Sequence, residues 1–215
     1  MDFEFSKEEK AFRAEVAEFI RGHADKPGVR HDNNCGTRFC DTPPRRQFMK
    51  ELAKKGYLGI CWPREYGGRD MSTVYDYLLN EELAVQGMAG TGKGVGTIGR
   101  TFILRGTEEQ KKKFLPMILN AEIEWAIGYT EPEAGSDLAS LKLKAVRDGD
   151  GWRLNGQKRF TSSAHFAEWY FLAARTDPDA PKHKGITLFV IDMKTPGITV
   201  NPMYCIDGER TNEVL

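Results

Sequence analysis

Long apolar runs are absent from this sequence, and none approaches the roughly 20 residues that a membrane-spanning helix needs. The N-terminus, MDFEFSKEEK, is too acidic and too polar for a secretory signal peptide. An excess of one charge is absent as well, because 31 lysines and arginines face 31 aspartates and glutamates. No net field therefore draws the chain to nucleic acid or to a membrane surface. These absences predict a cytoplasmic protein with no membrane span and no nucleic-acid partner.

Cysteine is also scarce. The four cysteines are irregularly spaced, at Cys35, Cys40, Cys61 and Cys205. Cys35 and Cys40 are separated by four residues with no second pair nearby, which disfavours a zinc site. Reduced thiols are the expected state of such cysteines in a cytoplasmic protein.

The 215 residues, enough for one or two domains with a sizeable core, fall into two halves with different periodicities. The first half, residues 1–120, has the periodicity of helices. Two capping boxes mark helix starts, at Ser6 with Glu9 and at Thr107 with Gln110. Apolar residues follow each box at helical spacing: Phe12, Val16, Phe19 and Ile20 after the first, and Phe114, Leu115, Ile118 and Leu119 after the second.

Two more helices are predicted between these boxes. Pro43 and Pro44 begin one that runs through Leu52 and stops near Gly56. The run VYDYLLNEELAVQ indicates the other, from apolar residues at helical spacing: Val74, Tyr77, Leu78 and Val85. The Gly/Pro-rich WPREYGG between them is typical of a turn.

The second half is predicted to be β-rich. From about residue 122 the sequence has short runs of β-branched and aromatic residues: WAIGYT, LKLKAVRD, GWRLNGQKRFTS, WYFLAART, ITLFVIDM and GITVNPMY. Leu141 and Leu143 alternate with Lys142 and Lys144, and Gly/Pro turns separate most runs, a pattern typical of a small barrel or sandwich. The sequence thus predicts an α+β chain: an all-α domain over residues 1–121 and a small β-barrel domain over 122–215.

The stretch GMAGTGKGVG, residues 87–96, comes close to a phosphate-binding P-loop. Gly94 stands where that loop needs the Ser or Thr that binds magnesium, and the stretch follows a helical pattern instead of a strand. A helix C-cap followed by a flexible turn is therefore the favoured interpretation. A loop that lines a ligand pocket remains open at this point.

The stretch YTEPEAGSD, residues 129–137, suits a polar ligand at the end of the first strand. Tyr129 offers an aromatic face and Thr130 a hydroxyl, while Gly135 and Ser136 present backbone N–H groups. A plain turn with solvated Glu131 and Asp137 explains the spacing equally well.

The residue identities in these segments are more specific than their spacing. YTEPEAGSDLASL and NGQKRFTSSAHFAEWYFLAARTDPD resemble signatures of the acyl-CoA dehydrogenase family, as do DFEFSKEEKAFRAEVAEFI, WPREYGG, NEELA and GTEEQKKKFLPMIL. The resemblance covers nearly the whole chain in the family's order. It implies a helical first domain, a β-barrel middle domain and FAD held at the barrel's edge.

The resemblance also implies roles for individual residues. Tyr129 and Thr130 match positions near the flavin's pyrimidine edge, and Ser136 matches one that touches cofactor phosphate and the CoA arm. The segment of Phe160, Thr161 and Ser162 matches one that crosses the flavin face, where many relatives carry Trp-Ile-Thr. The expected flavin contacts are Ile127, Gly128, Tyr129, Thr130, Gly135, Ser136, Phe160, Thr161 and Ser162, and the expected CoA contacts are Ser136, His183 and Lys184.

Two positions depart from the family pattern. Phe160 gives a smaller stacking surface than tryptophan, whereas Ser162 retains the hydroxyl needed to bond flavin N5. Barrel packing is the structural alternative for Phe160, and the favoured one for Trp169. The resemblance also answers the question of the stretch 87–96: in the family, the loop after the NEELA helix borders the acyl-chain pocket.

The proton-abstracting glutamate of the family lies in a third, C-terminal helical domain, so no residue of this chain is expected to be the catalytic base. The chain is accordingly expected to be a fragment, a truncated product or a subunit completed by another chain. The implied partners are an acyl-CoA substrate, an electron-transfer flavoprotein and further subunits of a homo- or hetero-oligomer. Two other functions remain open: a flavin-dependent monooxygenase on the same fold, and a non-catalytic subunit of a heteromeric dehydrogenase.

Overall fold

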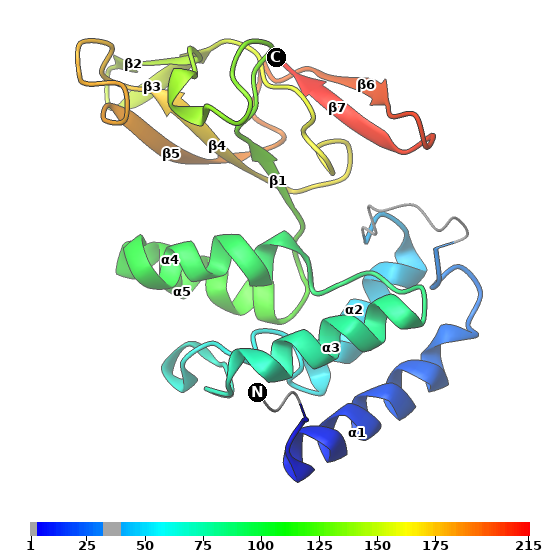
Figure 1. Ribbon diagram of the computed structural model, residues 1–215. Helices are drawn as coiled ribbons and strands as arrows, with labels where there is room; N and C mark the ends of the chain where they lie inside the picture. The colour runs from blue at the N-terminus through cyan, green and yellow to red at the C-terminus, as the bar shows by residue number, and fades with distance from the viewer. Residues whose placement is uncertain (1–3, 32–39) are drawn as a thin grey trace. The chain divides into compact units, whose positions relative to one another are not determined.

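The computed structural model describes residues 4–31 and 40–215 and divides the chain into two compact units, Met1–Glu122 and Ile123–Leu215 (Figure 1). The first unit is helical and the second is built from strands, so the predicted α+β class is confirmed. Within the described ranges, every helix is too short or too polar to cross a membrane.

The helical unit contains five α-helices, a 3-10 turn and a π-helical segment among its described residues. Their bounds are α1 Lys7–Ala24, α2 Pro43–Lys54, η1 Arg64–Tyr66 (3-10), α3 Thr73–Val85, η2 Gly94–Ile98 (π), α4 Gly99–Arg105 and α5 Glu108–Leu119. Both predicted capping boxes are present. The Glu9 N–H donates to Ser6 Oγ at 3.1 Å, and the Gln110 N–H donates to Thr107 Oγ1 at 3.2 Å. The N-terminal start of each of these two helices could therefore be predicted from sequence.

The core of the helical unit lies mainly along α1 and α3. Phe12, Val16 and Ile20 of α1 are buried as expected. The helix predicted from the spacing of Val74, Tyr77, Leu78 and Val85 is present as α3. Its buried residues are Leu78, Leu79, Glu82 and Leu83, whereas Tyr77 and Val85 are exposed.

The WPREYGG turn is fastened to the π-helical segment by Trp62. This side chain is fully buried, and its indole N–H donates to the Val95 carbonyl at 3.2 Å. A Cβ at Gly99 would lie 2.1 Å from the Trp62 ring, so only glycine allows the helix to approach it. The segment 94–105, which the sequence did not predict as helical, is therefore held in place by long-range packing.

The β unit contains a five-stranded sheet and a two-stranded hairpin. Their strands are β1 Trp125–Gly128, β2 Lys144–Asp148, β3 Gly151–Asn155, β4 Trp169–Arg175, β5 Ile186–Asp192, β6 Val200–Tyr204 and β7 Arg210–Val214. The sheet has the order β1-β4-β2-β3, and β5 also pairs with β4, outside this order (Figure 1). β6 and β7 pair with each other in the hairpin. The described strands thus form no closed barrel, which corrects the predicted barrel.

The central strand explains why the sheet stays open. β4 pairs in parallel with β1 over four residues and antiparallel with β5 over seven, whereas β2 meets it only at Lys144 and Arg175. The hairpin β6–β7 touches the rest through isolated bonds, including a bridge between Lys158 and Val214. No continuous ladder therefore connects the outer strands among the described residues.

Alternating burial follows the sequence pattern in the β unit. Leu141, Leu143 and Ala145 are buried, whereas Lys142 and Lys144 are exposed. Trp169, predicted to be a packing residue, is half-buried with its ring 6.3 Å from that of Trp125. The core also contains Ala126, Ala164, Ala167, Tyr170, Leu172, Ala174 and Val214.

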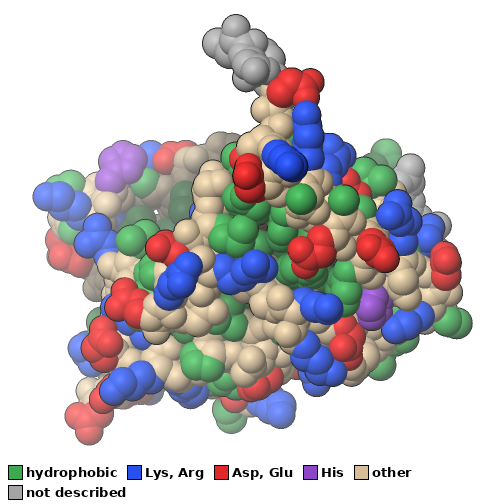
Figure 2. All heavy atoms as spheres, turned by 90° about the horizontal axis from the view of Figure 1, so that it is seen from below, with side chains coloured by type: hydrophobic (Ala, Val, Ile, Leu, Met, Phe, Trp, Pro, Cys, Tyr) green, Lys and Arg blue, Asp and Glu red, His purple; other side chains and the backbone are tan. Residues whose placement is uncertain are grey.

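Charged side chains of both signs are interspersed over the face shown in Figure 2, with apolar side chains exposed between them. This pattern agrees with the balanced composition of the whole sequence. The described cysteines are all free thiols, and the described residues contain no group of three or more potential metal ligands. Cys35, considered above as half of a zinc pair, lies outside the described residues.

Candidate functional site

The candidate site begins where β1 ends. A Cβ at Gly128, its last residue, would lie 2.2 Å from the buried Tyr170 hydroxyl, so glycine is required there. The next residue, Tyr129, is half-buried with its ring 6.5 Å from that of Phe171, and burial raises the pKa of its hydroxyl. The end of β1 and the first residue of the loop 129–136 are therefore both held by packing against β4.

A tight turn and a buried ion pair shape this loop. The Glu131 N–H donates to the Ala134 carbonyl at 2.8 Å, and the Ala134 N–H donates back at 3.2 Å. The Glu131 carboxylate lies 2.8 Å from Lys158 Nζ, and the Lys158 side chain is 0% exposed. The interpretation of Glu131 as a solvated turn residue was thus wrong. Asp137 is exposed, as expected, and pairs with Lys182.

The pair has perturbed pKa values with identifiable causes. Burial raises the pKa of the Glu131 carboxyl, but hydrogen bonds from Lys158, Lys142 and Leu143 outweigh it and leave that pKa below its usual value. Burial lowers the pKa of Lys158, and the attraction of Glu131 partly restores it. Each group therefore favours the charged form of the other.

The loop 129–136 forms one wall of the candidate site, and the segment 158–162 forms the second. The Lys158 N–H donates to the Val214 carbonyl at 2.8 Å, and the Thr161 N–H donates to the Asn212 carbonyl at 2.8 Å. Between these anchors Phe160 has a φ of +53° and is 58% exposed. This φ is rare for an aromatic residue, and such strain is often found at functional sites. Phe160 is thus excluded from the core, which overturns its alternative role in barrel packing.

Thr161 and Ser162 follow in a tight turn. The Ser162 N–H donates to the Phe160 carbonyl at 3.0 Å, and the Ser162 side chain is half-buried. Thr161 is fully buried. Burial raises the pKa of Tyr170, and a hydrogen bond with the Thr161 hydroxyl partly offsets this rise, so the two buried hydroxyls engage each other inside the β unit.

The structure brings the two walls together. The Arg159 N–H donates to the Thr130 carbonyl at 2.8 Å, and Lys158 Nζ donates to the Tyr129 carbonyl at 3.0 Å. The residues predicted from the sequence to face a flavin therefore lie on two segments that bond directly to each other.

The residues predicted to meet CoA lie on a neighbouring turn. His183 and Lys184 are exposed in the connection between β4 and β5. Arg175 donates to the carbonyls of Lys184 at 2.7 Å and of Ala139 at 2.6 Å, so it joins this turn to the chain that follows Ser136. Together with the Asp137–Lys182 pair, it holds both predicted CoA-contacting segments in one region of the β unit.

Sequence reasoning missed four residues that build this site: Glu131, Lys158, Arg175 and Asn212. Lys158 and Arg175 lie within the second quoted signature, but nothing in the local pattern distinguishes them from exposed cations. Asn212 belongs to β7, which the sequence did not predict as a strand. Its side chain donates to the Thr161 carbonyl at 3.0 Å, a contact across 51 residues that no local pattern reveals.

The stretch 87–96 is not a P-loop. It follows α3 instead of a strand, and its first residues form a helix C-cap with Gly87 at a φ of +73°. The Gly87 N–H donates to the Ala84 carbonyl at 3.0 Å and the Met88 N–H to the Leu83 carbonyl at 2.8 Å, as in a Schellman motif. The turn then enters the π-helical segment η2, a feature often found at functional sites.

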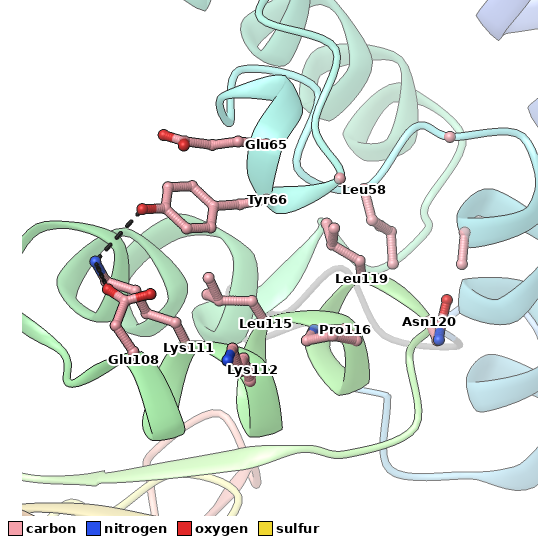
Figure 3. Close-up of a pocket in the computed structure, with 13 residues that line it drawn as sticks. Leu58, Glu65, Tyr66, Glu108, Lys111, Lys112, Leu115, Pro116, Leu119 and Asn120 are labelled. Carbon is pink, nitrogen blue, oxygen red and sulfur yellow. Dashed lines mark hydrogen bonds and ion pairs between the residues drawn. The ribbon is translucent and has the colours of Figure 1, made fainter.

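A cavity of about 710 Å³ lies in the helical unit, apart from every predicted site residue. Figure 3 shows Leu115 and Leu119 of α5 facing Tyr66, the last residue of η1, and Leu58, which lies between α2 and η1. Lys111 lies at the rim, 3.0 Å from Glu108 and 3.4 Å from the Tyr66 hydroxyl. Its cation is therefore already engaged by two neighbours.

Comparisons with known proteins support one family for both units. The family model described as "Acyl-CoA dehydrogenase, N-terminal domain" matches residues 6–122, and "Acyl-CoA dehydrogenase, middle domain" matches residues 126–214. Acyl-CoA dehydrogenase FadE29 of Mycobacterium tuberculosis is 45% identical over 77% of this chain and 43% of its own length.

Among the similar solved structures, two examples match the whole chain. "Tcur3481-Tcur3483 steroid ACAD" is 40% identical with a TM-score of 0.91, and this chain covers 55% of it. The ChsE4-ChsE5 complex from Mycobacterium tuberculosis is 29% identical with a TM-score of 0.88, and this chain covers 54% of the matched chain. The chain therefore spans about half the length of the proteins that it matches.

Proposed function

The chain belongs to the acyl-CoA dehydrogenase family, and from this premise we propose that it forms the N-terminal and middle part of an FAD-dependent acyl-CoA dehydrogenase. The reaction removes one hydrogen from each of the α- and β-carbons of an acyl-CoA thioester. The observation that carries the proposal is the direct bonding of the loop 129–136 to the segment 158–162.

The residues at this junction fit a flavin. Phe160 presents an exposed ring at the junction, and the half-buried side chain of Ser162 lies two residues after it. The backbone N–H groups of Gly135 and Ser136 donate no hydrogen bond within the described part of the chain, so they are available to phosphate oxygens. When bound, FAD supplies the acceptor for the hydride that leaves the β-carbon.

The chain's own residues bind and orient in this proposal. Ser162 donates a hydrogen bond toward flavin N5, and Phe160 covers part of the flavin face. Tyr129 and Thr130 hold the pyrimidine edge, with Ile127 and Gly128 behind them. Ser136 contacts phosphate and the CoA arm, and the CoA-contacting turn adds His183 and Lys184.

None of the residues at this junction is assigned as the base that removes the α-proton. Glu131 is a buried carboxylate within the loop, and three hydrogen bonds already engage its oxygens. These bonds lower its pKa, which makes it a weak base. We propose that the base comes from a segment outside this chain, in a homo- or hetero-oligomer.

The substrate proposed is a bulky acyl-CoA thioester. Support comes from the 40% identity to a protein described as a steroid ACAD. The loop 87–96 with its π-helical continuation is the proposed border of the acyl pocket, in which Gly96, where an added Cβ would meet nothing within 4 Å, leaves room for a wide substrate. We further propose an electron-transfer flavoprotein as the electron acceptor and the cytoplasm as the location.

A subunit of a heteromeric dehydrogenase is the second candidate function. It is favoured by the similarity to a chain of the ChsE4-ChsE5 complex. In that case this chain would supply flavin-binding walls and its partner the catalytic carboxylate. Copurification of the tagged chain with a second acyl-CoA dehydrogenase subunit from its own cell would favour this candidate, whereas self-association alone would oppose it.

An FAD titration of the chain, followed by flavin fluorescence, tests the primary proposal. We expect weak but saturable binding, and a roughly tenfold weaker affinity in Phe160→Ala because the ring contacts the flavin face. Tyr204→Ala is the matched control, since Tyr204 is an exposed aromatic residue on β6, outside the site. An absence of saturable binding by the unmodified chain, or equal losses in both variants, would contradict the assignment.

A further inference from the structure

Glu131 and Lys158 form a buried ion pair at the junction of the two proposed flavin-binding segments. Their side chains are 7% and 0% exposed. Burying two charges is costly unless their geometry is close and their remaining hydrogen-bonding groups are satisfied. The fold retains the pair next to a proposed cofactor site, which raises the question of what the pair does there.

The carboxylate of Glu131 accepts three hydrogen bonds, two at Oε1 and one at Oε2. Oε1 accepts from Lys158 Nζ at 2.8 Å and from the Leu143 N–H at 2.9 Å. Oε2 accepts from the Lys142 N–H at 2.6 Å. A glutamine cannot reproduce this arrangement, because its amide nitrogen would place N–H groups against either Lys142 or the Lys158–Leu143 side.

Lys158 completes the link to the loop. Its Nζ donates to the Tyr129 carbonyl at 3.0 Å as well as to Glu131. Besides these two bonds, one backbone bond joins the segment to the loop among the described residues, from the Arg159 N–H to the Thr130 carbonyl. Lys158 therefore donates two of the three hydrogen bonds that join these two segments in the described part of the chain.

We propose that Glu131 and Lys158 are positioning residues that fix the loop 129–136 against the segment 158–162, in the geometry that binds the flavin. This inference rests on the proposed function. Neither side chain is free to touch the cofactor, since both are buried and bonded to protein groups. Their effect passes through the Tyr129 carbonyl and the Leu143 backbone, which they hold.

A purely structural role of the ion pair and a positioning role predict different results for a set of variants. Lys158→Met leaves the Glu131 charge buried without its partner, so it should destabilise the β unit strongly. Adding Glu131→Gln removes that charge and should recover part of the stability. The double variant still lacks both hydrogen bonds that Lys158 donates, to the Tyr129 carbonyl and to Glu131. Stability should therefore recover without a recovery of FAD affinity.

The matched control is an exposed pair between the loop and the chain before β2, Glu133 and Lys142, whose side chains lie 2.6 Å apart and are 74% and 72% exposed. Glu133→Gln makes the same chemical change as Glu131→Gln, two residues away. It should leave FAD affinity, loop exchange and melting temperature unchanged, because exposed pairs contribute little.

Two measurements on the chain test the inference. Hydrogen exchange, which needs no flavin, should accelerate at the Lys142 and Leu143 amides in Glu131→Gln. FAD titration should show a roughly tenfold or greater loss of affinity in Glu131→Gln, Lys158→Met and the double variant, as misplaced binding groups produce. Unchanged exchange in Glu131→Gln, or affinity that recovers together with stability in the double variant, would overturn the inference. A failure of the unmodified chain to bind FAD would contradict the proposed function, and the exchange measurement would then decide the positioning role.

Discussion

Substitution of Gly128 by alanine is expected to destabilise the β unit by about 1–3 kcal/mol, the usual cost of overpacking a filled core. The added Cβ would lie 2.2 Å from Tyr170 Oη, 2.4 Å from its Cζ and 2.6 Å from its Cε2. Tyr170 is 3% exposed and packs among Ala126, Leu143 and Leu172, beside a cavity of about 270 Å³. Either β1 or the ring must move, and both hold the start of the loop 129–136.

Urea unfolding followed by circular dichroism measures this cost, with Gly135→Ala as control. A Cβ at Gly135 meets nothing within 4 Å and its φ is not positive, so that variant should be neutral or slightly more stable. Tyr170→Leu removes the crowding atoms and should cost less in the Gly128→Ala background than in the unmodified chain. A Gly128→Ala variant as stable as Gly135→Ala would refute the reasoning, because β1 would then have room to shift.

Three further predictions concern individual side chains. Ser162→Ala, measured in an enzyme that contains the catalytic base, should raise the activation free energy of flavin reduction by about 2.7–4 kcal/mol with little loss of thermal stability. A large loss of stability with an unchanged rate would assign Ser162 to folding alone. The folded-state pKa of Glu131 is lowered from its ordinary 4.5, so its stabilising contribution is complete above pH 4.5 and is lost as the pH falls through the lowered value. The stability difference between the unmodified chain and Glu131→Gln should therefore shrink on acidification, and a difference that grows instead would contradict the assigned direction. Ser6→Ala removes the side-chain acceptor of the α1 capping box and should cost about 1 kcal/mol in unfolding free energy, whereas Ser72→Ala, at a helix start without a side-chain cap bond, should cost less.

Local signals in the sequence predicted the features that depend on near neighbours. The capping boxes at Ser6 and Thr107 form because their partners are three residues away. The alternation around Leu141 and Leu143 survives because one face of that segment packs on the core. The order of a helical region before a β region followed from the same change in periodicity.

Features that depend on distant contacts could not be predicted in this way. The open sheet results from pairings of β4 with β1, at Trp125 and Trp169, and with β5, which hydrophobic runs do not encode. The helical state of residues 94–105 depends on Trp62, and the burial of Lys158 depends on Glu131, 27 residues earlier. Phe160 was singled out by resemblance, but its left-handed backbone follows from the bonds to Val214 and Asn212 on either side.

The central claim is that the loop 129–136 and the segment 158–162 of this chain form two walls of a flavin site. Nuclear magnetic resonance of the ¹⁵N-labelled chain, titrated with FAD, tests it most directly. The account predicts that shift changes concentrate at the amides of Gly135, Ser136, Phe160 and Ser162. Shift changes that cluster instead around the cavity of Leu115 and Leu119, or that spread without saturation over both units, would contradict it.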